Sequence, residues 1–560
     1  MNLEDQIKQI VKNIYGLDVN PVVSRTDPEH GDYASNVALQ IAKQVVKNPR
    51  EVADMIASKL VESGHKADVA GPGFINIHLS DQTLLDMVGA MPKQTLQDKV
   101  IICEYSDMNA FKTAHVGHLY TTLVGNAISN LHEAAGAKVI RANFGGDVGL
   151  HVGKAMWAIM NFIQNDLTNL GSVAEAERSG WVAARYVEGN TAYEDNDISK
   201  AEIIEVNKKV YELHVNGDKL SAFAQVYWAC RQWSYDGFEA FYDLLQLDKQ
   251  PDGAYFVYYP ESETAPFGKA LVEKGIEQGV FSISDGAAVY VGEPEGLHTR
   301  VFLTAQGLPT YETKDLGLAV KKWQDYKYDS SVIITANDIS EYMKVILSAL
   351  RKLLPIVDGK TRHVTHGLVK LAGGQKMSSR KGNVLLPEDV IEAAKSASQQ
   401  TAGKVDMQTV LGAIKYAFLK NKIGGDVIYD PIESISIQGN SGPYLQYAHA
   451  RACSIIAKLD GYGSQNISKI SGKDLQEGER LLVKKLGEYA EVVDAAVRDI
   501  TPHVVCTYLY ELAQEFNRFY ENNRVIGDER QALRLVLVTI YRDKLATGLK
   551  LLGITAPDKM

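Results

Sequence analysis

The chain has 560 residues, a formal net charge of −10, 45% hydrophobic and 23% charged residues, which is the composition of an ordinary soluble protein of several domains. No apolar run approaches the roughly 20 residues that span a membrane, so we expect a cytoplasmic protein without a membrane partner. The negative net charge excludes a generic nucleic-acid coat protein, because non-specific binding depends on Lys and Arg that neutralise phosphates.

Residues 1–95 are predicted to form a small α+β module followed by a linker. Helical patterns cover residues 3–15, 38–46 and 49–63, and residues 74–79 alternate between apolar and polar as a half-buried strand should. The module carries no pattern of catalytic residues, so binding or structural support is its expected role.

Residues 99–145 predict a strand-helix-strand unit of the kind found in parallel sheets. A buried strand is expected at residues 100–104, a helix at 117–135 and a second strand at 139–144. This unit is therefore expected to begin the catalytic sheet.

Two imidazoles flank a glycine where this helix begins, in the order His115, Gly117 and His118. The unpaired N–H groups and positive dipole of a helix N-terminus favour phosphate, and a glycine lets a ligand approach the backbone closely. The pattern predicts a nucleotide site, although two histidines three residues apart are more often surface residues when nothing else supports them.

A long insertion is predicted at residues 155–298, where helical patterns alternate with weakly patterned segments and no residues have catalytic spacing. The helical patterns lie at residues 156–165, 203–215 and 222–245, and the weakly alternating segments at 255–259 and 287–291. We interpret this insertion as a solvated scaffold.

The parallel-sheet pattern is expected to return at residues 300–304 and to continue through residues 331–335 and 363–369, with a helix at 340–354. Because a sheet that is interrupted and resumed implies one domain carrying an insert, residues 96–435 are predicted to form a Rossmann-type catalytic domain.

The C-terminal part, residues 436–560, is predicted to be an all-α helical bundle. Helical patterns begin at residue 410 and cover residues 410–420, 444–459, 478–495, 504–522 and 529–552. The predicted fold class is thus multidomain α/β, with an α+β module before the catalytic domain and a helical bundle after it.

A second candidate half of the site follows the strand expected at residues 363–369. Glycines loosen the backbone there, and Lys376, Arg380 and Lys381 crowd into six residues. A loop with several cations suits a polyphosphate whose negative charge grows during transfer. A solvated basic turn is the ordinary interpretation of such a loop, but the two histidines on the first strand-helix turn of the same sheet argue against it.

With both segments in view, the chain resembles the class I aminoacyl-tRNA synthetases. His115-Val116-Gly117-His118 resembles their HIGH motif, and Lys376-Met377-Ser378-Ser379-Arg380 resembles their KMSKS loop. The similarity is specific to the arginyl-tRNA synthetases in the segments GDYASNVAL, HEAAGAKVIRANFGGDVG, KMSSRKGNV, GNSGPYLQYAHAR and YLYELAQEFNRFYEN. It covers the chain from end to end and is weakest in the insertion.

The resemblance implies a two-step reaction. L-Arginine and ATP, which is accompanied by Mg²⁺, give arginyl-adenylate and pyrophosphate, and the 2′-hydroxyl of the terminal adenosine of tRNA(Arg) then takes the arginyl group. In this family arginine activation itself requires bound tRNA. The N-terminal module is expected to contact the tRNA elbow and the helical bundle to read the anticodon, with Tyr447 and Arg451 as candidate contacts because loop bases stack on aromatic rings and Arg planes.

The resemblance also assigns the ATP site. The residues expected to bind ATP are His115, Gly117, His118, Lys376, Met377 and Ser378. His115, His118 and Lys376 are the expected catalytic groups, because donors and cations stabilise charge on the leaving phosphates. Since the second lysine of the family's loop is Ser379 here, Lys112 is expected to supply the lost charge, with Arg380 and Lys381 as alternatives.

Four residues are expected to bind arginine: Glu104, Asn109, Tyr311 and Asp315. A guanidinium presents a fixed fork of donors and needs a planar anionic partner. Tyr311 and Asp315, four apart on one helix face, are assigned to the guanidinium end, and Asn109 is placed nearer the α-amino or carboxylate end. Whether Asn337 or Asp338 completes the pocket is open at this point.

Three alternatives compete with this interpretation: a synthetase for lysine, glutamate or cysteine, a small nucleotidyltransferase, and a tRNA-binding paralogue without catalysis. The four cysteines lie far apart without zinc-ligand spacing, so we expect no metal site and disfavour a cysteine enzyme. Glutamate would need cations where Glu104 and Asp315 stand, and a nucleotidyltransferase lacks the long helical C-terminus. We expect a monomer.

Overall fold

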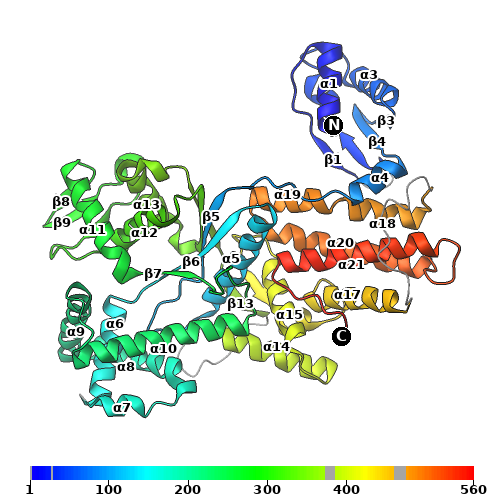
Figure 1. Ribbon diagram of the computed structural model, residues 1–560. Coiled ribbons are helices and arrows are strands. Elements are labelled where there is room, and N and C mark those ends of the chain that lie inside the picture. Colours follow the sequence, from blue (N-terminus) through cyan, green and yellow to red (C-terminus); the bar gives the residue numbers. More distant parts are fainter. Residues whose placement is uncertain (1–2, 27–29, 165, 373–384, 459–473) are drawn as a thin grey trace. The chain divides into compact units, whose positions relative to one another are not determined.

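The computed structural model describes residues 3–26, 30–164, 166–372, 385–458 and 474–560, and the chain forms two compact units (Figure 1). Unit 1 comprises Met1–Met91, Ser454–Glu491 and Glu511–Lys544. Unit 2 comprises Pro92–Cys453, Val492–Tyr510 and Leu545–Met560. Both units therefore contain segments that are distant in sequence.

Unit 2 is built on a five-stranded, all-parallel sheet with the strand order β12-β11-β5-β6-β7. The strands are β5 (Val100–Glu104), β6 (Lys138–Gly145), β7 (Val257–Pro260), β11 (Ser330–Ala336) and β12 (Thr361–His366). The chain leaves the central strand β5 toward β6 on one side and returns as β11 on the other. Such a switch point opens a crevice at the carboxyl ends of the strands, where ligands of open α/β sheets bind. The predicted Rossmann-type fold class is confirmed.

Helix α5 (Val116–Ala134) follows β5 and contacts the neighbouring strands of the sheet. His115 caps its N-terminus, and 14 of its 19 residues are buried, polar residues such as Thr122 and Ser129 among them. Gly125 allows the ring of Tyr105 to lie against the helix, since a Cβ at this position would stand 2.1 Å from Tyr105 Cγ. The predicted helix at 117–135 is confirmed with its start one residue earlier.

Two strand predictions around the insertion are wrong in their pairing. β10 (Arg300–Leu303) does not join the parallel sheet but pairs antiparallel with β9 (Ala287–Tyr290), which also pairs with β8 (Ser282–Ser284). Conversely, β7, which lies in the weakly alternating segment of the insertion, is an edge strand of the parallel sheet. Four-residue apolar runs do not encode their partner strand, so only the tertiary structure assigns them.

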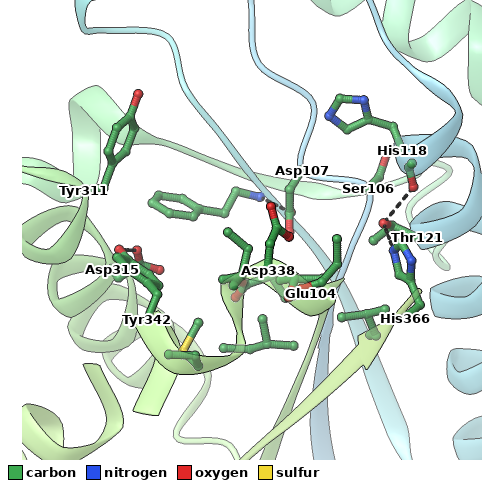
Figure 2. Close-up of a pocket in the computed structure, with 18 of the residues that line it drawn as sticks. Glu104, Ser106, Asp107, His118, Thr121, Tyr311, Asp315, Asp338, Tyr342 and His366 are labelled. Atoms are coloured by element: carbon green, nitrogen blue, oxygen red, sulfur yellow. Dashed lines mark hydrogen bonds between the residues drawn. The ribbon is translucent and has the colours of Figure 1, made fainter. Parts of the chain in front are cut away.

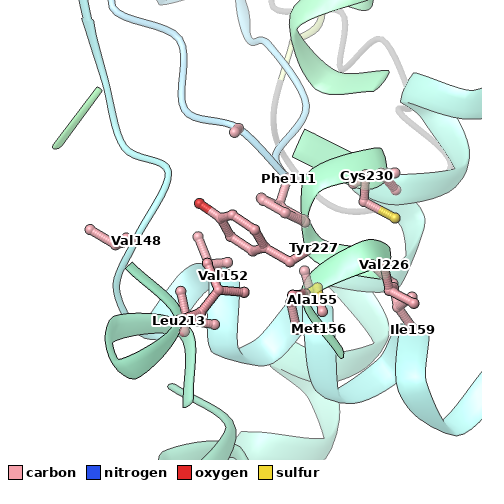
Figure 3. Close-up of a cluster of buried hydrophobic side chains, with 14 of the residues drawn as sticks. Phe111, Val148, Val152, Ala155, Met156, Ile159, Leu213, Val226, Tyr227 and Cys230 are labelled. Atoms are coloured by element: carbon pink, nitrogen blue, oxygen red, sulfur yellow. The ribbon is translucent and has the colours of Figure 1, made fainter. Parts of the chain in front are cut away.

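The insertion is more than a solvated scaffold, because its helices bury the loop that follows β5. The helices are α6 (Leu150–Ile163), α7 (Leu167–Gly171), α8 (Arg178–Asp195), α9 (Asp197–Val215) and α10 (Ala222–Leu244). Figure 3 shows Phe111 from that loop in an apolar cluster with Tyr227 and Cys230. The Phe111 N–H also donates to Ser234 Oγ at 3.0 Å. The insertion therefore fixes the segment that leads into the histidine motif.

The N-terminal part of unit 1 is an α+β module with the antiparallel strand order β1-β2-β4-β3. Its elements are α1 (Leu3–Tyr15), β1 (Val23–Arg25), β2 (Tyr33–Ser35), α2 (Val37–Ile41), α3 (Pro49–Glu62), β3 (Lys66–Ala70), β4 (Phe74–His78) and α4 (Asp81–Val88). The α+β prediction is confirmed, although α2 is shorter than the helix expected at 38–46.

The C-terminal part of the chain is helical, as predicted. Its elements, which follow α14 (Pro387–Ala402) and α15 (Met407–Leu419), are α16 (Pro431–Ile435), α17 (Gly442–Ala457), α18 (Glu477–Gly487), α19 (Tyr489–Asp499), α20 (Pro502–Asn522) and α21 (Gln531–Leu551). The prediction of a single helix at 478–495 is wrong. The first helix, α18, ends at Gly487, a residue type of low helix propensity, and Glu488 separates it from α19. None of the described helices combines the length and apolar character needed to cross a membrane.

Candidate active site

A cavity of about 560 Å³ opens at the carboxyl ends of β5 and β11 in unit 2 (Figure 2). Its walls come from β5 and the loop after it, α5, β11, α12 (Tyr311–Tyr326) and α13 (Ser340–Leu353). The lining includes Glu104, Ser106, Asp107, His115, Gly117, His118, Thr121, Phe144, Arg300, Tyr311, Glu312, Asp315, Asp338, Tyr342 and His366. The cavity thus brings together the predicted histidines and most of the predicted arginine-binding residues.

The two histidines of the motif are neutral hydrogen-bond donors. His115 Nδ1 accepts from Gly117 N at 3.1 Å, and His118 Nδ1 accepts from His115 N at 3.1 Å. Burial, helped by the charge of Lys112, lowers the pKa of both rings, that of His118 to about 3. Because Nδ1 accepts in each ring, Nε2 carries the proton. The capping geometry therefore presents two N–H donors beside the helix N-terminus.

Leu385, which follows the segment of the predicted basic loop, contacts the start of α5 beside these histidines. Val116 N donates to the carbonyl oxygen of Leu385 at 2.8 Å, which places the chain after residue 384 at the first turn of α5. Lys376, Met377 and Ser378 lie outside the described residues. The hydrogen bond therefore places Leu385, the first described residue after that segment, beside the histidine motif.

Asp315 is a buried carboxyl group in the part of the cavity formed by α12 and α13, next to the hydroxyl of Tyr342. The Tyr342 hydroxyl donates to Asp315. Burial, reinforced by the charge of Glu104, raises the pKa of Asp315 to about 7, although the hydrogen bond from Tyr342 opposes the shift. Tyr311 lines the same wall and keeps 58% of its surface exposed. Glu104 lines the cavity too, but its carboxylate already pairs with buried Lys322 at 2.5 Å.

Two predicted residues stand outside the lining described here. Asn109 Oδ1 accepts from Gly146 N at 2.8 Å and so braces the backbone. Lys112 has its Nζ 5.1 Å from the centre of the Tyr186 ring, and burial lowers its pKa. Asn337 and Asp338, the two candidates for completing the arginine pocket, differ in position. Asn337 donates to the Gly424 carbonyl oxygen at 2.9 Å, whereas Asp338 lines the cavity.

The sequence analysis missed several lining residues. Asp107 and Ser106 follow β5, His366 ends β12, and the hydroxyl of Thr121 contacts His366 Nε2 at 2.7 Å. The position of Asp107, an acidic residue three positions after the end of β5, is a usable signal, since ligand-binding residues gather there. No local pattern marks His366, because only the sheet brings it beside α5.

Carboxyl groups outnumber cationic groups in the lining of the cavity. Five carboxyl groups line it, those of Glu104, Asp107, Glu312, Asp315 and Asp338. Glu104 pairs with Lys322, and Glu312 pairs with Arg300 at 3.0 Å. In the described part of the chain the other three carboxyl groups form no ion pair, so the arrangement suits a cationic ligand beside a phosphate held by the histidines.

The candidate tRNA contacts lie on α17. Tyr447 is 46% exposed, and Arg451 is half-buried. Their neighbour His449 packs instead, with Nδ1 against the Pro557 carbonyl oxygen at 2.9 Å.

His449, Cys453 and Asp558 bring atoms of the types that bind metals within 4.8 Å of one another. Sequence spacing did not show this grouping because Asp558 is distant in the chain from the other two.

Three family matches cover the chain almost completely. Residues 1–79 match the arginyl tRNA synthetase N-terminal domain, residues 81–434 the catalytic domain of class I tRNA synthetases (R), and residues 445–560 the DALR anticodon binding domain.

Full-length relatives agree with these matches. A curated arginine–tRNA ligase of Porphyromonas gingivalis is 28% identical over 611 residues, covering 100% of this chain and 99% of that protein. One of Phocaeicola vulgatus is 29% identical over 621 residues and covers both chains completely, 100% of each.

Solved structures share the fold. The arginyl-tRNA synthetase of Thermus thermophilus has a TM-score of 0.79 at 24% identity, covering 100% of this chain and 99% of that one. That of Plasmodium falciparum has a TM-score of 0.81 at 20% identity, covering 100% and 98%. The catalytic-domain match spans well over half of the chain. The chain belongs to the arginyl-tRNA synthetase family of class I aminoacyl-tRNA synthetases.

Proposed function

We propose that this chain ligates L-arginine to tRNA(Arg) at the expense of ATP, through an arginyl-adenylate intermediate. The observation that carries this proposal is one cavity with neutral N–H donors at one end and unpaired carboxyl groups at the other. Arginine has two cationic groups to match the carboxyl groups, and its carboxylate must meet a phosphate. A lysine side chain is also cationic, and the family match is what selects arginine.

In the first step the arginine carboxylate attacks the α-phosphorus of ATP and pyrophosphate leaves. His115 and His118 would donate Nε2–H to the phosphate oxygens, and Lys376 would neutralise the leaving pyrophosphate. These groups do no covalent chemistry, since phosphoryl-transfer sites act mainly by positioning and by stabilising charge. Asp315 and Tyr311 would hold the guanidinium. Glu104, whose carboxylate forms an ion pair with Lys322, would contribute to the electrostatic field at the arginine site.

The remaining assignments complete the proposal. Mg²⁺ would enter as the ATP complex. Residues 1–95 and 436–560 would bind tRNA around the catalytic residues 96–435, in line with family matches at 1–79, 81–434 and 445–560. A cytoplasmic monomer is the form we propose.

Pyrophosphate exchange into ATP tests this function. The assay is run with each of the amino acids separately, with and without total tRNA. Exchange with arginine alone, and only when tRNA is present, is the expected result. Exchange with another amino acid, or with none, would refute the proposed function. Exchange with arginine in the absence of tRNA would remove the tRNA requirement and leave the substrate assignment in place.

A further inference from the structure

We propose that His449, Cys453 and Asp558 form a binding site for a zinc ion, with water as the fourth ligand. The three residues belong to unit 2, where the end of the chain lies beside α17 (Figure 1). They are not part of the lining described for the candidate active site. The inference therefore goes beyond the proposed ligase function and does not depend on it.

Two of the ligands stand on one face of α17. His449 and Cys453 are four residues apart in this helix, and side chains at this spacing are neighbours on a helix surface. A helix presents two zinc ligands at the same spacing in the H-E-x-x-H motif. His449 is 3% exposed and Cys453 is half-buried, so packing against the rest of unit 2 restricts both side chains.

The third ligand comes from the segment after α21, which hydrogen bonds attach to α17. Gln446 Nε2 donates to the Thr555 carbonyl oxygen at 2.9 Å. The ring of His449 bonds in the same way to the Pro557 carbonyl oxygen, at 2.9 Å. Asp558 follows directly in the chain, so an ordered segment brings its carboxylate to the two ligands on the helix.

The hydrogen bond of His449 leaves the correct ring nitrogen for a metal. A carbonyl oxygen can only accept, so Nδ1 carries the proton that it donates to Pro557. In the neutral ring Nε2 then has a lone pair to offer to the ion. Histidines that bind metals almost always donate their other ring N–H to a carbonyl or carboxylate oxygen, which fixes the orientation of the ring.

The three ligand atoms lie close enough together for one small ion. Cys453 Sγ is 3.5 Å from Asp558 Oδ1 and 3.9 Å from His449 Nε2. In a tetrahedral zinc site, bonds of about 2.3 Å to sulfur and about 2.0–2.1 Å to nitrogen and oxygen keep these atoms roughly 3.5 Å apart. Because Sγ is almost equally far from His449 Nδ1, at 3.8 Å, the Cys453 side chain must rotate toward Nε2 as the ion binds.

The mixture of donor atoms selects zinc. Zn²⁺ accepts thiolate, imidazole and carboxylate ligands together, whereas Mg²⁺ and Ca²⁺ prefer oxygen ligands. On binding, the Cys453 thiol would release its proton to solvent, because the thiolate is the ligand. Asp558 is exposed, which leaves an entry path for the ion and room for the water ligand.

A bound ion would cross-link the end of the chain to α17, the helix that carries the candidate tRNA contacts Tyr447 and Arg451. The sequence-based expectation of no metal site considered only linear spacing. Asp558 lies 105 residues beyond Cys453, so only the folded chain brings the third ligand to the helix.

Metal binding is tested on the full-length protein, freed of metal with a chelator and kept reduced with a phosphine. Co²⁺ serves as a coloured substitute for zinc. We expect one Co²⁺ per chain, with the intense visible bands of tetrahedral cobalt and a thiolate-to-cobalt charge-transfer band in the near ultraviolet. One equivalent of Zn²⁺ should remove both signals. Zinc should also slow hydrogen exchange in the C-terminal peptide.

Two variants each remove one ligand and keep the bond between His449 and Pro557. Cys453→Ser should abolish the charge-transfer band. Asp558→Asn changes an exposed side chain and should keep that band, so it decides the matter even if Cys453→Ser does not fold. Each should weaken zinc binding, measured against a competing chelator, at least about tenfold, since even hydrogen-bond partners of metal ligands contribute that much.

His78→Gln is the matched control, because it removes an imidazole that lies 2.9 Å from the Asp68 carboxylate in unit 1. It should leave the spectrum and the zinc affinity unchanged. A wild-type cobalt spectrum without the thiolate band would overturn the inference, and so would equal zinc affinities of the wild type and Asp558→Asn. Pyrophosphate exchange is not a readout here, so neither result bears on the proposed function.

Discussion

Asp315 must be ionised to hold a guanidinium, and its buried position makes that ionisation depend on pH near neutrality. Its pKa is raised to about 7, so below that pH the free protein carries mostly the neutral acid. We predict that kcat/KM for arginine rises about tenfold per pH unit below 7 and levels off above it, because this profile reports ionisations of the free enzyme.

Asp315→Asn should abolish this pH dependence and reduce arginine use far more than ATP binding. The measurement is the pH profile of arginine-dependent exchange together with the dissociation constant for ATP. If arginine use and ATP binding were weakened equally, the assignment of the guanidinium site to Asp315 would be wrong. A profile that falls with rising pH would contradict the assignment of the ionised form.

Lys112 is predicted to replace the loop lysine that Ser379 lacks. It lies outside the described lining, yet its charge acts on both His115 and His118. Lys376→Ala should slow exchange roughly a hundred- to a thousandfold, the loss typical of one charge-stabilising group, and Lys112→Ala should slow it by at least about tenfold. Both are measured as exchange rates at saturating ATP. An unchanged rate in Lys112→Ala would return the role to Arg380 or Lys381.

At the scale of elements, the packing of helix α5 against Tyr105 requires a residue without a side chain at position 125. A Cβ on Gly125 would stand 2.1 Å from the ring of Tyr105, which is itself 1% exposed. Gly125→Ala is predicted to destabilise unit 2 by about 1–3 kcal/mol, the usual cost of overpacking a core. The measurement is the urea midpoint followed by Trp fluorescence, since all five tryptophans belong to unit 2.

Gly180→Ala on α8 is the matched control for this helix substitution. A Cβ at Gly180 meets nothing within 4 Å, so the change should be neutral or stabilise by up to about 1 kcal/mol through the higher helix propensity of alanine. If the two variants unfold at the same urea concentration, the close approach of Tyr105 and α5 is not important for stability.

At the scale of the whole molecule, unit 1 is held by a buried ion cluster distant in sequence from its N-terminal sheet. Glu479 is fully buried and pairs with Arg530 at 2.5 Å and with Arg534 at 2.9 Å. Burial opposes its ionisation, but hydrogen bonds from Arg530 and other donors outweigh burial and lower its pKa. A lowered folded-state pKa means that this contribution is present above the unfolded pKa and is lost as the pH falls through the folded one.

Glu479→Gln is predicted to cost unit 1 about 3 kcal/mol, because it removes the fully buried charge that pairs with Arg530 and with buried Arg534, leaving Arg534, among the described residues, only its 3.3 Å ion pair with Asp528. Hydrogen exchange of peptides from α18 should accelerate, while the Trp-monitored unfolding of unit 2 stays unchanged. Glu62→Gln removes an exposed pair with Lys59 in the same unit and should change stability by less than about 1 kcal/mol. Equal effects of the two substitutions would contradict a structural role for the buried cluster.

The sequence by itself determined the fold class and the nucleotide motif, whereas the division at residues 95 and 435 stays a prediction beside the two compact units of the structure. These features are encoded locally, as the apolar period of α5, the strand at 100–104 and the H-x-G-H turn all lie within short windows. The resemblance added arginine and tRNA, because linear motifs in order along the chain identify a family.

Only the tertiary structure decided which side chains meet. Strand pairing placed β10 outside the parallel sheet and β7 inside it, and the fold brought His366 to Thr121 and Lys322 to Glu104 across more than 200 residues. Pairing partners, buried ion pairs and the left-handed turn at Asp107 depend on long-range packing, which no local window of sequence encodes.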